Sequence, residues 1–182
     1  LAEVVLPGTV EVAEDPVAAI RGADVAMIAT PTAGLRYAAG LVHHAAVRRP
    51  VVWVCKGFEQ SSGKLPHQVV AEVLGETAPA AALSGPSFAL EVARGLPTAV
   101  TLAAADAGFA RDLALELHQR RLRLYFTDDL VGVEVGGAVK NVMAIATGIS
   151  DGMGFGLNAR AALITRGLAE LTRLAVAIGG QL

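Results

Sequence analysis

Short apolar runs alternate with stretches of helical periodicity between residues 24 and 127. The apolar runs are bounded by polar residues, glycine or proline, which is typical of buried strands, and they cover residues 25–29, 51–55, 80–83, 98–103 and 122–126. Apolar residues spaced three and four positions apart predict helices at residues 33–47, 65–74, 87–94 and 109–119. This alternation predicts an α/β fold in which βαβ units build a parallel sheet.

The pattern changes after Asp129. From Val135 onward the apolar residues follow one face of a helix, and a second face of this kind begins at Arg160. Because no strand pattern lies between them, the two helices predict a second, all-helical unit. The glycine-rich residues 151–158 are predicted to separate these helices.

Composition narrows the class of protein. The chain has 182 residues, of which 53% are hydrophobic and 18% are charged, with a formal net charge of −2 and one cysteine. This length suffices for one domain, or two small ones, with a real core. The near-neutral charge argues against binding of nucleic acid or of an anionic membrane surface, and no uninterrupted apolar stretch approaches the ~20 residues of a membrane span. Cys55 has no second cysteine to pair with, which favours a reducing compartment.

Two predicted strands end in residues that could bind a ligand. Lys56 directly follows the strand at 51–55, and Ser84, Gly85 and Ser87 lie where the strand at 80–83 gives way to a helix. Ligands of open parallel sheets bind outside the carboxyl ends of the strands, so these residues and Thr30 are candidates. The alternatives are a solvated lysine and ordinary helix capping by Ser84.

Lys140 follows Gly136 and Gly137 on a helix whose apolar residues predict burial. Burial disfavours the charged ammonium and lowers its pKa toward values suited to proton transfer at neutral pH, and the glycines one turn earlier would admit a ligand or another backbone. The alternative is a lysine at the rim of the helix that extends its ammonium into water.

Other residues that match known motifs give weaker evidence of a functional site. Residues 154–159 formally match the dinucleotide fingerprint G-x-G-x-x-A, but they follow a predicted helix, whereas the fingerprint needs a preceding strand. None of the four histidines has the spacing of a zinc helix, so no metal site is predicted and the histidines are expected to be solvated: His43, His44, His67 and His118. Cys55 is expected to be a packing residue.

Several longer motifs carry a family resemblance. The run VGGAVKNVMAIATGISDGMGFG at residues 135–156 and the run NARAALITRGLAE at residues 158–170 closely resemble the signature of the bacterial NAD(P)-dependent glycerol-3-phosphate dehydrogenases. The strand-end motifs VCKGFE at residues 54–59 and LSGPSFA at residues 83–89 resemble that family in the same order. The resemblance therefore covers essentially the whole chain.

The resemblance implies a fold and an activity. It implies a partial Rossmann-like parallel sheet, the C-terminal part of a dinucleotide-binding domain, in residues 1–128, followed by the first helices of an all-α substrate domain in residues 129–182. It implies reduction of dihydroxyacetone phosphate to sn-glycerol 3-phosphate with NADH or NADPH, feeding glycerophospholipid synthesis. A cytoplasmic protein is expected, with a small-molecule substrate, no nucleic-acid partner and no membrane-spanning segment, and a homodimer is the candidate assembly.

Specific roles come with the family motifs. The lysine matching Lys140 is the proton donor or acceptor on the C2 oxygen, and the asparagine matching Asn141 orients the substrate. The lysine matching Lys56 touches both cofactor and substrate. Gly85 and Ser87 match substrate-binding positions, and Ala89 matches a cofactor contact.

The sequence also departs from the family pattern. Thr30-Pro31-Thr32 replaces the valine-proline-serine of many members, and Leu157 replaces aspartate or alanine. The glycine-rich diphosphate loop is expected before Leu1, and a phosphate-binding arginine and a substrate-binding aspartate after Leu182, so we expect a segment of a longer protein that is inactive alone. Two alternatives stay open: another lysine-using NADP reductase, of the 2-dehydropantoate or 6-phosphogluconate type, and a non-catalytic nucleotide-binding module.

Overall fold

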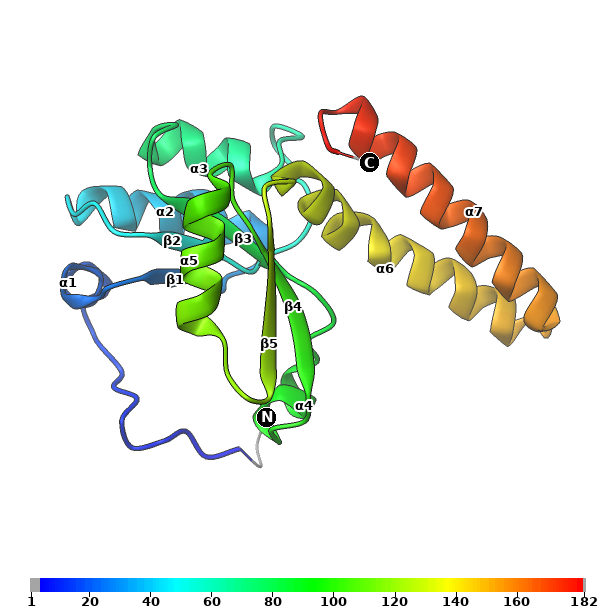
Figure 1. The fold of residues 1–182 in the computed structure, drawn as a ribbon, viewed down its shortest axis with the longest axis horizontal. Coiled ribbons are helices and arrows are strands. Elements are labelled where there is room, and N and C mark those ends of the chain that lie inside the picture. The colour runs from blue at the N-terminus through cyan, green and yellow to red at the C-terminus, as the bar shows by residue number, and fades with distance from the viewer. Residues whose placement is uncertain (1–3, 182) are drawn as a thin grey trace.

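A five-stranded sheet organises the first two thirds of the chain (Figure 1). The structure, a computed structural model, describes residues 4–181. The strands lie side by side in chain order: β1 (Ala26–Ile28), β2 (Val51–Trp53), β3 (Ala80–Ser84), β4 (Thr98–Ala103) and β5 (Leu122–Thr127). The pairs β1–β2, β2–β3 and β4–β5 are parallel. The predicted α/β class is confirmed.

The pair β3–β4 is antiparallel, unlike the uniformly parallel sheet that the alternation predicts. The connection between these strands contains only the short helix α4 (Ala89–Ala93). Figure 1 shows α4 beyond the end of β4 and not across a face of the sheet. Because α4 makes no crossover over the sheet, the chain turns back and β4 runs alongside β3 in the opposite direction.

Helices cover both faces of the sheet. The 3₁₀ turn η1 (Thr32–Gly34) leads into α2 (Leu35–His44). α2 and α3 (Pro66–Leu74) lie on one face of the sheet, and α5 (Ala107–Leu117) lies on the other. Side chains alternate between the faces along a strand. Val51 and Trp53 accordingly pack with α2 and α3, whereas Val52 packs with α5. All three side chains are buried, which fixes the register of the central strand.

One helix was not predicted. α1 (Pro16–Gly22) begins where the Asp15 side chain accepts hydrogen bonds from the backbone N–H groups of Val17 and Ala18, at 2.8 and 3.2 Å. Pro16 at the first helical position has a backbone φ already suited to a helix. The helix is short and buries no residue, so the apolar periodicity that reveals the other helices is missing here.

The last two helices form a hairpin that extends away from the sheet (Figure 1). α6 (Leu130–Gly152) and α7 (Gly156–Ala177) are longer than predicted, because the helices continue into the glycine-rich segment and only residues 153–155 separate them. Gly154 and Gly156, with φ of 70° and 82°, adopt the left-handed backbone that this tight turn needs.

The buried apolar side chains of the hairpin lie near the sheet, and farther out Ser150 and Gly167 are buried between the two helices. Val135 and Ala175 form a small cluster with Leu65, while Val142 and Ile149, on the stripe expected to be buried, are exposed. Of the described helices, α6 alone is long and apolar enough to cross a membrane by length and composition. That test is also passed by core helices of water-soluble proteins, so it is weak support for a membrane span.

Candidate active site

The carboxyl ends of β1, β2 and β3 meet at one edge of the sheet, as their parallel order requires. The Thr32 hydroxyl, just after β1, donates to the backbone carbonyl of Lys56 at 2.8 Å. The Lys56 ammonium in turn donates to the backbone carbonyl of Gly85 at 3.1 Å. The three strand ends singled out from the sequence are therefore linked by direct hydrogen bonds.

Gly85 occupies a position that only glycine fits. Its φ is +152°, and a Cβ built on it would lie 2.9 Å from the Cα of Val100 and 3.0 Å from the carbonyl oxygen of Ala99. Both atoms belong to the backbone of β4, which is paired on both sides. The missing side chain lets the chain leave β3 directly against β4, with its carbonyl turned to Lys56.

α6 approaches the same edge through Gly137. A Cβ at this residue would lie 3.0 Å from the Ser84 hydroxyl and 3.4 Å from Cγ of Lys56. Gly137 is buried, and Lys140, one helical turn further on, is exposed. The predicted burial of Lys140 is therefore wrong, because α6 moves away from the sheet after Gly137.

The two lysines act on each other electrostatically. Partial burial and the neighbouring Lys140 ammonium lower the pKa of Lys56. Like charges this close oppose one another, and an anion placed between them would relieve the repulsion. The arrangement is therefore suited to binding a negatively charged ligand or a polarised carbonyl.

A hollow of about 290 Å³ lies beside this pair, near the lower limit of the ~300–1,000 Å³ of small-molecule sites. Of the described residues that line it, none is acidic: Ser84, Gly85, Pro86, Thr101, Gly132, Val133, Gly136, Gly137 and Lys140. The hollow thus combines a small volume, glycine backbone and positive charge.

Other predicted site residues lie nearby but do not line this hollow. The Ser87 hydroxyl is 3.5 Å from the carbonyl oxygen of Gly85. Asn141 is exposed next to Lys140, and Ala89 is exposed at the start of α4. The alternative that Ser84 caps a helix is wrong, because α4 begins after Phe88 and has no side-chain cap.

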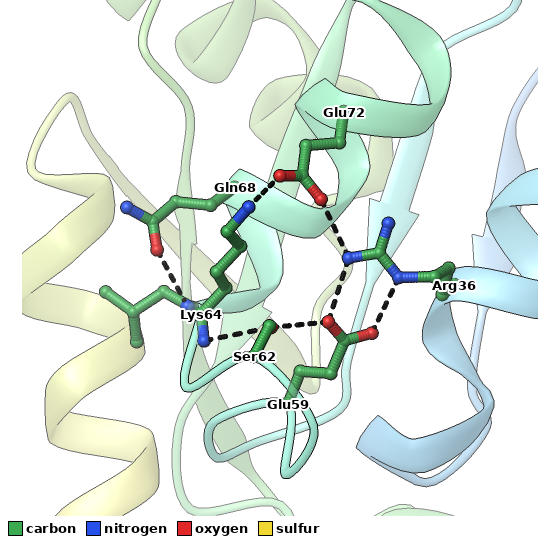
Figure 2. A network of polar contacts seen from close by, with 7 residues as sticks. Arg36, Glu59, Ser62, Lys64, Gln68 and Glu72 are labelled. Atoms are coloured by element: carbon green, nitrogen blue, oxygen red, sulfur yellow. Dashed lines mark hydrogen bonds and ion pairs between the residues drawn. The ribbon is translucent and has the colours of Figure 1, made fainter.

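A polar network fixes the loop that follows Lys56 (Figure 2). Arg36 of α2 donates two hydrogen bonds of 2.8 Å to the carboxylate of Glu59 and one of 2.8 Å to Glu72 of α3. The Ser62 hydroxyl donates to Glu59 at 2.6 Å, and Lys64 pairs with Glu72. The loop between β2 and α3 is thereby tied to two helices.

This network predicts a specific acid sensitivity. Arg36 and Ser62 lower the pKa of Glu59 from its usual value of 4.5 to about 2. A carboxylate whose pKa is lower in the folded state than in the unfolded state stabilises the fold when the pH is above its unfolded-state pKa. This contribution is lost as the pH falls through the folded-state pKa. We expect an Arg36→Gln variant to melt at a lower temperature than the wild type at pH 7, and the gap in melting temperature to shrink between about pH 5 and pH 2.

Arg48→Gln is the matched control, because the Arg48 guanidinium donates to the backbone carbonyl of Thr77 at 3.0 Å. A gap for Arg36→Gln that is as independent of pH as the gap for Arg48→Gln would contradict the assigned role of Glu59.

Sequence reasoning missed a buried carboxylate. Glu134 on α6 is 6% exposed and binds both Trp53 and His67. The expectation that His67 is solvated is therefore wrong, whereas His43 and His44 are exposed as predicted. The available signal was an acidic residue between two valines in an apolar helix, which predicts a buried polar group with partners.

Cys55 and the G-x-G-x-x-A match have the structural roles predicted for them. Cys55 follows β2, packs against the core, and has a thiol pKa raised by burial. The G-x-G-x-x-A match falls on the turn between α6 and α7, with no strand before it. Among residues 4–181 no cluster of three or more histidine, cysteine or acidic residues could hold a metal ion.

Comparisons with known proteins agree on one family. Residues 1–110 match the profile of the NAD-dependent glycerol-3-phosphate dehydrogenase N-terminus, and residues 129–182 match that of the C-terminus. A glycerol-3-phosphate dehydrogenase [NAD(P)+] of Dechloromonas aromatica is 61% identical over 176 residues, covering 97% of this chain and 54% of the relative. The corresponding protein of Aromatoleum aromaticum is 59% identical over 175 residues, covering 96% and 53%.

The fold of a solved relative agrees as well. The crystal structure of glycerol-3-phosphate dehydrogenase from Coxiella burnetii superposes with a TM-score of 0.90 at 43% identity, covering all of this chain and 55% of that protein. The chain spans about half the length of the curated relatives it matches.

Proposed function

Because the chain belongs to the family of NAD-dependent glycerol-3-phosphate dehydrogenases, we propose that the full-length protein reduces dihydroxyacetone phosphate to sn-glycerol 3-phosphate. The observation that carries the proposal is the Lys56–Lys140 pair beside a small hollow without acidic lining. Such a site suits a small phosphorylated ketone, because positive charge attracts the phosphate and stabilises the oxygen that becomes negative during reduction.

The roles of the two lysines follow from their places. Lys140 lines the hollow and is solvent-exposed, so we assign it the proton that the C2 oxygen takes up. Lys56 is held by its bond to Gly85 and orients the substrate, together with Gly85, Ser87 and Asn141. Hydride added to C2 and a proton added to the oxygen convert the ketone into the alcohol.

NAD or NADP is the proposed cofactor, and its reduced form, NADH or NADPH, would supply the hydride when bound. The described residues fit the reactive end of such a cofactor: Lys56 lies at the carboxyl ends of parallel strands, where dinucleotides bind, and Ala89 begins the helix beyond β3. Residues 4–181 contain no glycine-rich turn from a strand into a helix of the kind that binds the diphosphate. We therefore assign these residues to the nicotinamide and substrate end only.

The test is substrate choice by the full-length protein. We expect NADH or NADPH to be oxidised when dihydroxyacetone phosphate is added and not when 2-dehydropantoate is added, and 6-phosphogluconate not to reduce NADP+. Turnover of either of those two compounds in place of dihydroxyacetone phosphate would favour the related lysine-using reductases. Cofactor binding without turnover of any of the three would favour the nucleotide-binding module.

We also propose a setting for this activity. A single cysteine without an internal partner supports a cytoplasmic, reducing location, and the product suits a supply of glycerophospholipid precursors. The division into a dinucleotide-binding unit up to residue 128 and a helical unit from residue 129 and the assembly as a homodimer stay predictions.

A further inference from the structure

A buried carboxylate connects the sheet to the helix that carries Lys140. One oxygen of Glu134 accepts hydrogen bonds from the indole N–H of Trp53 at 2.8 Å and from the backbone N–H of His67 at 2.9 Å. Its other oxygen lies 2.5 Å from Nδ1 of His67. Trp53 is 1% exposed and the Glu134 side chain is 3% exposed, whereas the His67 side chain is 23% exposed, so the carboxylate and the indole are shielded from water and the imidazole is only partly shielded.

The three residues of this group belong to three elements. Trp53 is the last residue of β2 and precedes Lys56 by three positions, whereas His67 lies in the first turn of α3. Glu134 lies in the second turn of α6 and precedes Lys140 by six positions. One carboxylate therefore links the strand that leads to one lysine with the helix that bears the other.

A small change in the direction of α6 at Glu134 would displace Lys140. Six residues of helix rise by about 9 Å. A tilt of α6 by about 10° at Glu134 would therefore move the backbone of Lys140 by about 1.5 Å. Displacements of about 1 Å in a reacting group can cost ~10²-fold in rate.

Apolar packing at this part of α6 is centred on Val135, which is fully buried against Leu65 and Ala175. Gly136 has nothing within 4 Å of its Cβ position, and Gly137 presents no side chain to the sheet. Beyond Lys140 the apolar residues Val142 and Ile145 are exposed. The loop that follows Lys56 lies between β2 and α3. The hydrogen bonds of Glu134 join α6 to both of these elements, and they are the hydrogen bonds of this kind nearest to Lys140.

We propose that Glu134 is a positioning residue, which through Trp53 and His67 fixes the direction of α6 and thereby the place of Lys140 relative to Lys56. The proposal rests on the proposed function, in which both lysines act on one substrate. Glu134 itself does not line the hollow, so its effect on the reaction passes through the helix.

The chemistry of the contacts selects the variants. In Glu134→Gln the amide oxygen still accepts from both N–H donors, so the link persists. Glu134→Ala leaves the buried Trp53 indole N–H and the partly buried His67 backbone N–H without their acceptor, which is costly. Trp53→Phe removes one donor and keeps an aromatic ring, and it serves where Glu134→Ala fails to fold.

The test measures kcat, KM and melting temperature of the full-length protein with dihydroxyacetone phosphate. We expect Glu134→Ala to lower kcat by about 10- to 100-fold at temperatures where it is folded, Trp53→Phe to lower it by a smaller factor, and Glu134→Gln to stay within about threefold of the wild type. Leu171→Ala is the matched control, because Leu171 packs at the α6–α7 contact and its truncation lowers the melting temperature without touching the Glu134 link.

Three results would overturn the proposal: an unchanged kcat in Glu134→Ala, an equal loss of kcat in Leu171→Ala, or a loss in Glu134→Gln as large as in Glu134→Ala. Hydrogen exchange of the amides at residues 137–145 provides a readout that needs no turnover. Faster exchange in Glu134→Ala but not in Glu134→Gln supports the link, and unchanged exchange in both rejects it. A wild-type protein without turnover would reject the proposed function instead, and the exchange result would still decide the role of Glu134.

Discussion

Replacing Lys140 with alanine in the full-length protein is expected to lower kcat for reduction of dihydroxyacetone phosphate by at least ~10²-fold, since general acid catalysis contributes about 10²- to 10⁴-fold. The affinity for NADH or NADPH should change little, because Lys140 lies at the substrate hollow on α6 and not at the start of α4. Lys140 is exposed and alanine is a strong helix former, so the variant should fold. Steady-state kinetics and a fluorescence titration with NADPH measure the two effects.

Lys140→Arg distinguishes the contribution of proton transfer from that of the positive charge. The guanidinium keeps a positive charge beside Lys56, but its pKa is too high for it to give up a proton during turnover. We expect this variant to bind substrate better than Lys140→Ala and to show a similarly low kcat. Near-normal oxidation of NADPH by Lys140→Ala would remove the assignment of proton transfer to this residue.

The elements with strong apolar patterns could be predicted from the sequence. β4 has the bounds predicted for it, and β2, β3 and β5 differ from their predictions by one or two residues. The direction of β4 could not be predicted, because it depends on where α4 lies and not on any local pattern. α1 depends on the cap at Asp15 and has too few buried residues to produce a periodicity.

The site, too, could be predicted only in part from the sequence. That the residues following β1, β2 and β3 meet at one edge was predictable, because parallel strands end at the same side of a sheet. The partners of Glu134 were not, since Trp53 and His67 precede it by 81 and 67 positions. The exposure of Lys140 also depends on the path of α6 after Gly137, which the apolar stripe of the helix does not reveal.

Gly85→Ala is expected to destabilise the full-length protein by about 2–5 kcal/mol, combining the cost of a strained backbone conformation with that of overpacking. The added methyl group would meet the backbone of β4 at 2.9–3.0 Å, and β4 cannot retreat without losing its pairing with β3 or β5. The turn would have to shift, and the carbonyl that binds Lys56 would shift with it. We therefore expect a loss of activity beyond the loss of stability, measured by urea denaturation and by kcat under conditions where the variant is folded.

Gly63→Ala isolates the backbone contribution to this effect. Gly63 also has a positive φ, of +69°, but nothing lies within 4 Å of its Cβ position. Its substitution should therefore cost only the ~1–2 kcal/mol of a left-handed conformation. If Gly85→Ala is as stable as Gly63→Ala or more stable, β4 must shift to accommodate the methyl group. In that case the close contact between Gly85 and β4 is not what holds the Gly85 carbonyl against Lys56.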